Sequence, residues 1–336
     1  MIQTMESRAP RARQAKNEHS TATMRAAAID AFGGPEVLTI HTLPVPKPEP
    51  LEVLIALDTS GVGVWDAEMR AGWVPDGRPR FPLVLGTDGA GTVAAVGSRI
   101  RRFKVGDLVY SYSFYNRKGG FYAEYVAVPA DKVAHVPEGR DLRHAGAIPT
   151  TGLTALQGID DALHLKRGET IIIHGAAGGV GSLAIQFAKL RKARVFATAT
   201  GDDGVEFVRF LGADAAVDGR GDDITLAART FAPDGADAVL GLVGDGLSFC
   251  LDAMRSGGRF AYPNGVEPVP KKRQGIQFIP YDAVPGVRQF ERLNRAVEAA
   301  DLQVPIDAEY PLEDASKAHE RLAAGHVLGK IVLRVR

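Results

Sequence analysis

The segment "IIIHGAAGGVGSLAIQFAKL", residues 171–190, joins an apolar run to an amphipathic one through a glycine-rich turn. The turn departs from the G-x-G-x-x-G pattern of dinucleotide-binding loops at one position, because Ala176 stands where the first glycine is usual. Gly178 occupies the position where phosphates approach the backbone, and Gly181 the position where the helix packs on the sheet. Ala176 can serve at its position if its φ angle is negative. We therefore expect the loop to bind a pyrophosphate.

Pyrophosphate binding by such a turn depends on backbone N–H groups and on the positive end of the following helix, and less on side chains. Apolar residues recur at helical spacing after the turn, from Val180 to Ala188, which predicts a helix lying on a sheet. A strand precedes the turn and further strand–helix units follow it, so dinucleotide binding is favoured over a plain tight turn. The expected binding residues are Ala176, Ala177, Gly178, Gly179, Val180 and Gly181.

The choice of nicotinamide cofactor depends on "RVFATATGDDG", residues 194–204, where NAD-binding domains place an acid on the ribose hydroxyls. Ala199 stands at that position, so a 2′-phosphate is not repelled, and Thr200 could donate a hydrogen bond to it. Arg220, after the next expected strand, is the nearest candidate countercharge. The aspartates at 202–203 could bind a ribose or be solvated turn residues. The pattern favours NADP(H) over NAD(H).

The elements that must position this loop fall into two regions. From residue 24 to about 147, short β-branched runs separated by glycine and proline predict a compact, mostly β domain. After Pro149, apolar runs alternate with amphipathic helices, which predicts an α/β fold with a doubly wound parallel sheet. Near the end, a helix stopped by Gly325 and a final strand are expected to return to the β domain. Residues 1–23 are polar and predict a disordered tail, with a transit peptide as the weaker alternative.

The bulk composition excludes several classes of function. The 336 residues are 45% hydrophobic, and 40 basic side chains balance 40 acidic ones, so charge favours neither nucleic acid nor an anionic membrane as a partner. No apolar run approaches the roughly 18 residues that cross a bilayer. Cys250 is the only cysteine, which excludes an internal disulfide and every multi-cysteine zinc site. A cytoplasmic location fits this composition best.

Several spaced motifs resemble one family. Together with "GAAGGVG", the stretches "FPLVLGTDGAGTVAAVG", "GGFYAEYVAVP", "GAIPTTGLTAL" and "GHVLGKIVL" resemble the medium-chain dehydrogenase/reductase superfamily, in particular its zinc-free quinone oxidoreductase, or zeta-crystallin-like, branch. The resemblance runs from Met24 to the C-terminus. It implies a GroES-like catalytic domain over residues 24–147 and 288–336, and a Rossmann NADP(H)-binding domain over residues 148–287. It also implies an active site in the cleft between them and a homodimer or homotetramer.

The zinc alcohol dehydrogenases of the superfamily are the natural rival. Their ligand pattern falls on Gly63 and Thr87 and close to Ala147, and Asp88 stands where a neighbouring glutamate is usual. None of the three ligand positions carries a usual zinc ligand, so we expect no zinc. Without a metal, hydride transfer needs an acceptor that is already electrophilic, and the resemblance implies a small-molecule quinone or α,β-unsaturated carbonyl (enone) reduced by NADPH.

Residues for placing the nicotinamide are suggested by the resemblance alone: Thr151, Gly244, Asn264, Phe278 in a "QFIPYD" loop, and Lys330. Gly244 and Asn264 also follow expected strands, where ligands sit in open parallel sheets. His174 is expected to pack beside a strand end and to take no part in catalysis.

The sequence does not determine which residue donates a proton to the substrate. Relatives carry an asparagine shortly before the aspartate matched by Asp66 and a tyrosine beyond it, and these positions hold Gly63 and Trp73. Tyr115 is the candidate donor, on a loop that also offers Tyr112 and Asn116, and Trp65 and Trp73 are candidate pocket walls. The loss of the usual polar residues leaves a non-catalytic, crystallin-like NADPH-binding protein as the alternative.

Overall fold

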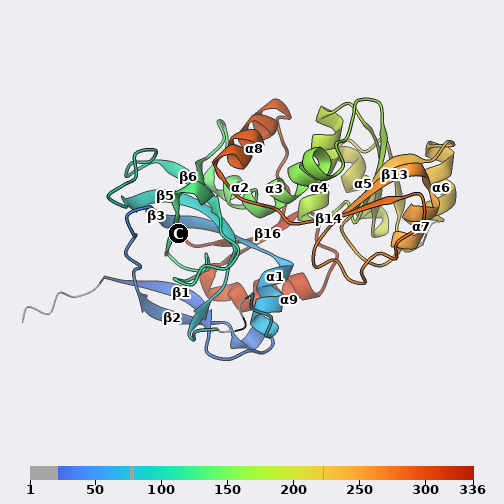
Figure 1. Ribbon diagram of the computed structural model, residues 1–336. Helices are drawn as coiled ribbons and strands as arrows, with labels where there is room; N and C mark the ends of the chain where they lie inside the picture. Colours follow the sequence, from blue (N-terminus) through green and yellow to red (C-terminus); the bar gives the residue numbers. More distant parts are fainter. Residues whose placement is uncertain (1–21, 76, 78, 222) are drawn as a thin grey trace, which may run out of the picture.

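The computed structural model describes residues 22–75, 77, 79–221 and 223–336, and it contains two sheet-based parts side by side (Figure 1). The disordered tail is predicted for residues 1–23, and residues 1–21 of it lie outside the described residues. The first strand, β1, already begins at Thr23. Among the described helices, none combines the length and the apolarity needed to cross a bilayer.

The first part is built from extended segments rich in valine, isoleucine and alanine. Its larger sheet follows the order β15-β16-β3-β5-β6-β8, and β7 also pairs with β3. A smaller sheet has the order β2-β1-β4. The strands are β1 (Thr23–Ile29), β2 (Thr39–Pro44), β3 (Glu52–Val62), β4 (Leu83–Val84), β5 (Asp88–Val96), β6 (Leu108–Tyr112), β7 (Tyr125–Pro129) and β8 (Val133–His135).

The chain returns to this part at its end, as the sequence predicts. Strands β15 (Ile306–Pro311) and β16 (Lys330–Arg334) are parallel to each other, and β16 pairs with β3 in antiparallel register, Ile331 opposite Val62. Helix α9 (Ala315–Ala323) lies between them in sequence and ends just before Gly325. It lies beside helix α1 (Val64–Ala71), which directly follows β3 (Figure 1).

The second part is a six-stranded, wholly parallel sheet with the order β11-β10-β9-β12-β13-β14. This arrangement confirms the predicted doubly wound sheet, with the chain reversing direction across the sheet next to β9. Its strands are β9 (Thr170–His174), β10 (Arg194–Ala199), β11 (Ala215–Asp218), β12 (Ala236–Gly241), β13 (Met254–Pro263) and β14 (Gln277–Tyr281).

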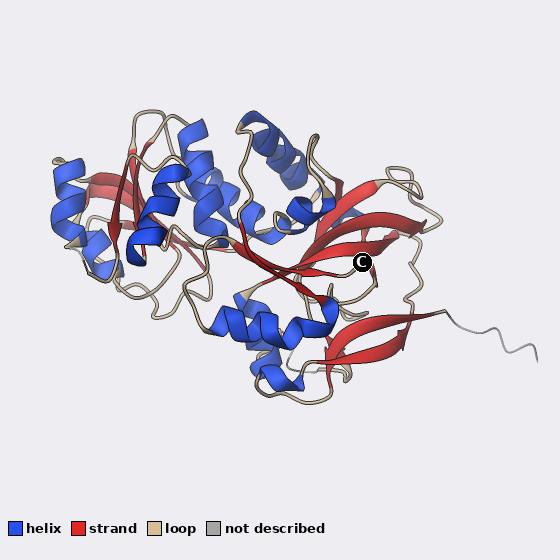
Figure 2. Cartoon of the chain, turned by 180° about the vertical axis from the view of Figure 1, so that it is seen from behind, coloured by secondary structure: helices blue, strands red, loops and turns tan. Residues whose placement is uncertain are grey.

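Helices cover this parallel sheet, whereas the larger sheet of the first part carries few (Figure 2). Those that connect its strands are α4 (Gly179–Leu190), α5 (Gly201–Phe210), α6 (Ile224–Phe231) and α7 (Leu247–Asp252). The two parts are joined by α2 (Leu142–Gly146), α3 (Pro149–Gln157) and α8 (Val287–Ala299). Short helical turns are η1 (Pro35–Val37), η2 (Ala130–Lys132), η3 (Gly158–Ala162) and η4 (Leu312–Asp314). The expected boundaries at residues 147 and 287 stay predictions.

One expected element is wrong. The segment "QFIPYD" was expected to be a loop, but residues 277–281 form the edge strand β14, parallel to β13 with Phe278 opposite Phe260. Pro280 lacks a backbone N–H and is tolerated here because an edge strand needs hydrogen bonds on one side only.

The packing of α4 on the sheet allows a test of the fold. Phe187, on the buried face of α4, is fully enclosed, whereas Phe210, near the end of α5, is 78% exposed. Replacing Phe187 by alanine is expected to lower the free energy of unfolding by about 3–5 kcal/mol, because a cavity remains against the strands. Phe210→Ala, the matched control, should change it by no more than about 0.5 kcal/mol. Urea denaturation measures both, and equal effects would contradict the assigned packing.

Candidate active site

The glycine-rich turn begins at the end of β9, and its tightest residue is Gly175. Gly175 has φ of +80°, in the left-handed region that favours glycine, while Ala176 does not have a positive φ. Ala176 is buried, and its N–H donates to the carbonyl oxygen of Thr198 at 2.8 Å. The condition that the sequence sets for alanine at this position is therefore met, because the left-handed turn is made one residue earlier.

Helix α4 starts at the loop without a side-chain cap, with Gly178 as its N-cap residue. The N–H groups of its first turn, at residues 179–181, point out of the helix start as donors without intrahelical partners. A Cβ on Gly178 would meet nothing nearer than the Gly175 oxygen at 3.9 Å, so this side of the loop is open. A Cβ on Gly181 would lie 2.6 Å from backbone atoms of Ala176, so this side is closed by the turn that follows β9. The loop is thus a cradle of backbone donors with room for an anion.

The C-terminal segment passes directly beside the cradle. Gly329 forms a parallel bridge with Gly178, and its N–H donates to the carbonyl oxygen of Ala177 at 2.8 Å. A Cβ on Gly179 would lie 3.0 Å from Cγ2 of Thr151 and 3.5 Å from Cδ of Lys330. Thr151 and Lys330 are therefore brought to the loop. The hydroxyl of Thr151 is engaged by the carbonyl of Ala147 at 2.7 Å.

The residues expected at the cofactor's ribose lie on neighbouring strands. Thr200 follows β10 and precedes α5, and Arg220 is exposed two residues after β11, which pairs with β10. Asp203 forms an ion pair with His326 at 2.8 Å, and this hydrogen bond lowers the pKa of Asp203. Asp218, at the end of β11, accepts a hydrogen bond from the Arg220 N–H at 2.9 Å. Thr200 and Arg220 thus share one edge of the sheet.

Of the residues expected to place the nicotinamide, Gly244 and Asn264 follow β12 and β13 at the same edge. Asn264 donates from its side chain to Asp282 at 2.8 Å. Phe278 is not brought to this edge but lies within β14, where its ring stacks on Phe260 with 5.3 Å between centroids. This ring packs on the sheet face.

His174 is engaged on both ring nitrogens. Nε2 lies 2.5 Å from the carbonyl oxygen of Asp245, and Nδ1 lies 2.7 Å from the Thr198 hydroxyl. Because a carbonyl can only accept, Nε2 carries the proton and Nδ1 accepts from Thr198. Burial lowers the pKa of His174, so the ring is neutral. These contacts agree with the packing role expected from the sequence.

Two buried carboxyl groups lie near Lys330, and the sequence named both as positions matched to the family pattern without giving them a role. Asp66 and Asp88 are fully enclosed. A Cβ on Gly61 of β3 would lie 2.4 Å from Oδ1 of Asp88 and 2.9 Å from Cε of Lys330. The Lys330 side chain and the Asp88 carboxylate therefore both lie close to Gly61. Burial raises the pKa of Asp66 to about 7, and the charge of Asp88 adds to this effect.

Tyr112 lies between the two parts of the molecule. Burial, followed by the negative charges of Asp88, Asp282 and Asp66, raises its pKa above the usual value. Asp88 belongs to β5 and Asp282 follows β14, so this side chain is within electrostatic reach of both sides of the cleft. Tyr115, the expected proton donor, packs instead against the core of the first part. Asn116 donates from its side chain to the carbonyl of Ala127 in β7 at 2.8 Å.

The two tryptophans are joined by a third ring, which the sequence did not single out. Phe114 lies edge-on to Trp65 at 6.3 Å and tilted to Trp73 at 5.8 Å, measured between ring centroids. Trp65 is half-buried and Trp73 is 51% exposed. Nε1 of Trp65 lies 3.0 Å from the position of a Cβ on Gly63. The three rings form one aromatic wall. The sequence signal that could have indicated Phe114 is the aromatic run "YSYSFY", in which it follows Tyr112 by two residues.

The positions matched to zinc ligands do not fit a metal. Gly63, Thr87 and Ala147 offer no thiolate, imidazole or carboxylate. Within residues 22–75, 77, 79–221 and 223–336, no group of three or more histidine, cysteine, aspartate or glutamate side chains is arranged to hold a metal ion. Burial raises the pKa of Cys250 to about 12, so this thiol is not a thiolate at neutral pH.

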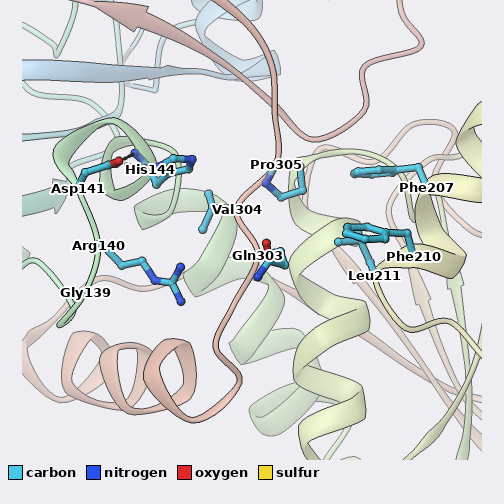
Figure 3. A pocket seen from close by; sticks show the side chains of 10 residues that line it. All are labelled: Gly139, Arg140, Asp141, His144, Phe207, Phe210, Leu211, Gln303, Val304 and Pro305. Carbon is cyan, nitrogen blue, oxygen red and sulfur yellow. Dashed lines mark hydrogen bonds and ion pairs between the residues drawn. The ribbon is translucent and has the colours of Figure 1, made fainter.

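A cavity of about 440 Å³ lies elsewhere on the molecule (Figure 3). Arg140 and His144 border it on one side, and Phe207 and Phe210 of α5 border it on the other. Gln303 lies between them. None of its lining residues belongs to the glycine loop or to the carboxyl pair. The chemistry therefore points to the glycine loop, and not to this cavity, as the site.

Comparison with known proteins identifies related sequences over almost the whole chain. A family described as zinc-binding dehydrogenase matches residues 211–333, and one described as alcohol dehydrogenase GroES-like domain matches residues 49–138. The quinone oxidoreductase of Lama guanicoe is 31% identical over 328 residues, covering 93% of this chain and 98% of that protein. A probable quinone oxidoreductase of Schizosaccharomyces pombe is 33% identical over 323 residues, covering 91% and 95%.

Solved structures are similar at the level of the whole fold. An NAD-dependent alcohol dehydrogenase superposes with a TM-score of 0.86 and 33% identity, covering 93% of this chain and all of that one. The quinone oxidoreductase of Coxiella burnetii superposes with a TM-score of 0.85 and 29% identity, covering 94% of this chain. A mycobacterial protein solved in complex with NADPH gives 0.83 and 28%, covering 93%.

Gly181 and Gly178 are expected to tolerate an added methyl group to different extents. Gly181→Ala is expected to lower the free energy of unfolding by about 1–3 kcal/mol, because the added methyl group meets backbone that cannot move aside. This cost exceeds the roughly 1 kcal/mol that alanine's helix propensity returns. Gly178→Ala should cost less than about 1 kcal/mol, because its side of the loop is open. Chemical denaturation compares the two, and equal losses would show that the cradle is not shaped as described.

Proposed function

Because the chain belongs to the medium-chain dehydrogenase/reductase superfamily, in its zinc-free quinone oxidoreductase branch, we propose that this oxidoreductase uses NADPH to reduce a quinone or an α,β-unsaturated carbonyl. The observation that carries the proposal is the cradle at Gly178, where a helix start directs backbone donors into open space. A dinucleotide's pyrophosphate fits this chemistry because it is an anion that needs close backbone approach.

The preference for NADPH rests on the strand edge beyond the cradle. Thr200 offers a hydroxyl at the end of β10, and Arg220 offers a cation one strand further. Asp203 is held by His326, so its carboxylate is turned to a partner within the protein. Similar structures include both an NAD-dependent enzyme and an NADPH complex, so the preference is argued from these residues.

When bound, the reduced nicotinamide supplies the hydride. The protein's own part is to orient the acceptor, exclude water and supply a hydrogen bond to the oxygen that gains charge. The aromatic wall of Trp65, Phe114 and Trp73 offers faces against which a flat acceptor can stack. We assign the hydrogen bond to Tyr112, in place of Tyr115, because Tyr112 lies between both sides of the cleft and its raised pKa keeps the hydroxyl protonated.

No metal enters this proposal. The side chains at the three matched ligand positions do not fit zinc, so an alcohol could not be activated there by a metal. An acceptor that is already electrophilic needs no such activation. Assembly as a homodimer or homotetramer is proposed from the family resemblance.

The first prediction concerns the reaction. Protein treated with a chelator is expected to consume NADPH in proportion to added quinone or enone, which is measured by the loss of reduced-nicotinamide absorbance. Simple alcohols with oxidised cofactor, with and without zinc, are the control. Activity restricted to alcohols plus zinc would contradict the proposal. Tight NADPH binding without turnover on any acceptor would favour the non-catalytic, crystallin-like alternative. That alternative is considered because Gly63 and Trp73 stand where relatives carry an asparagine and a tyrosine.

The second prediction concerns the cofactor. Arg220→Ala is expected to weaken NADPH binding about tenfold, equal to about 1.4 kcal/mol, and to leave NADH binding unchanged, because only NADPH carries the 2′-phosphate. Arg288→Ala, at an exposed arginine of α8, is the matched control for loss of one positive charge. Titration calorimetry with both cofactors measures the effect. A parallel loss for NADH would place Arg220 outside the phosphate site.

A further inference from the structure

Exposed aromatic side chains gather at the end of helix α1. Among the described residues, five phenylalanine and tryptophan side chains are exposed, and three of them lie there: Phe32, Trp73 and Phe81, with exposed fractions of 38%, 51% and 43%. The rings of Phe32 and Phe81 meet edge to face with 5.4 Å between their centroids. Apolar surface left in water is unfavourable, so three such rings in one place mark a surface that gains stability when an apolar group covers it.

These rings continue the aromatic wall of the candidate site. Trp73 belongs to both groups, because its ring is tilted against Phe114 at 5.8 Å and its backbone directly follows Gly72. A Cβ on Gly72 would lie 3.8 Å from Cγ of Phe32, so the segment that carries Phe32 lies against the turn that ends α1. Aromatic surface therefore extends from the wall to the pair of Phe32 and Phe81.

Helix α1 gives this surface its direction. Val62, two residues before α1, pairs with Ile331, which comes two residues after the Gly329 that bridges the glycine loop. The start of α1, with Trp65, is thus its end nearer to the candidate site. The helix has eight residues, so its other end lies about 12 Å further on. The aromatic surface runs outward from the candidate site over that length.

The opposite face of α1 is fixed by a buried chain of hydrogen bonds. Nη1 of Arg70 lies 2.8 Å from Nδ1 of His319, and a guanidinium can only donate, so the ring proton is on Nε2. Nε2 donates to the Tyr122 hydroxyl at 3.1 Å, and this hydroxyl donates onward to Oδ2 of Asp66 at 3.2 Å. All four side chains are buried. The chain ties α1 to α9, so the exposed rings are carried on a fixed backbone.

Charge around the rings argues against an ionic occupant. The exposed charged residues close to the rings in sequence are, within the described part of the chain, Asp30, Glu36, Glu68 and Arg80. Acids outnumber bases, so an anionic ligand or an anionic lipid surface would be repelled. An uncharged apolar group meets no such opposition.

Resting on the function proposed above, we infer that the outer aromatic face, formed by Phe32, Trp73 and Phe81, binds an apolar chain carried by the acceptor. The substrate is then a quinone or enone with an alkyl or isoprenoid substituent. Its reacting ring or double bond lies against the wall at Trp65 and Phe114, and its chain follows α1 outward. Covering the rings withdraws apolar surface of both partners from water, and the gain grows with the length of the chain.

The test compares benzoquinones that share one ring and carry either a methyl group or a decyl chain. For the unaltered protein, kcat/KM is expected to be about tenfold higher with the decyl chain, mainly through KM, because a chain on an open face buries part of its surface. In the double variant Phe32→Ala with Phe81→Ala, this ratio should fall to about threefold or less. A ratio that stays at the unaltered value in this variant overturns the inference.

A second double variant, Phe210→Ala with Phe249→Ala, is the matched control. It also removes two exposed phenylalanines, from α5 and α7 beside the parallel sheet, and should leave the ratio unchanged. An equal fall in both double variants would show general adsorption of long chains and would overturn the inference. So would a loss of self-association or of binding to lipid vesicles in the Phe32→Ala, Phe81→Ala variant with the ratio intact.

Titration calorimetry with the corresponding hydroquinones, which cannot accept a hydride, separates this inference from the proposed reaction. Tighter binding of the decyl than of the methyl hydroquinone, lost in the Phe32→Ala, Phe81→Ala variant, supports the inference even if no acceptor is reduced. Reduction of both quinones with equal kcat/KM, together with equal hydroquinone binding, overturns the inference and leaves the proposed reaction intact.

Discussion

The close approach of helix α4 to the turn after strand β9 is the constraint on which the rest of the site depends. At Gly181 the helix meets the backbone of Ala176 at a distance that excludes any side chain. This contact sets the direction of α4, so that its unpaired N–H groups open into the cleft at Gly178. The neighbouring turn can then accept an alanine, because Gly175 supplies the left-handed residue. The departure from the usual glycine pattern is thus a shift of the turn by one residue.

The second constraint joins the two parts of the molecule. The bridge between Gly329 and Gly178 brings the last strand against the glycine loop, and Lys330 extends from there toward Asp88. Residues more than a hundred positions apart in sequence therefore meet at one place. The same strand pairs with β3, which leads into α1 and Trp65, so one strand connects the glycine loop with the aromatic wall.

The cleft combines apolar rings with enclosed polar groups, and the two serve different purposes. The rings of Trp65, Phe114 and Trp73 offer non-directional contact to a flat molecule. The polar groups are each directed by a partner, and the chain through His319 ends on a single oxygen of Asp66. A buried polar network is stabilising when its members are paired, and each group along this chain has such a partner.

The sequence by itself determined the alternation of strands and helices in the parallel sheet, the return of the C-terminus and the position of the glycine loop, because hydrophobic period and turn chemistry are local. Strand β14 was not predicted, because a short edge strand that contains Pro280 resembles a loop in sequence. Only the tertiary structure decided that Tyr112 is within electrostatic reach of both parts of the molecule while Tyr115 packs against the core of the first part. The buried chain from Arg70 to Asp66 was also beyond the sequence, because its members come from separate elements. Local patterns specify which backbone forms, whereas pairing between distant side chains depends on how the elements fold against one another.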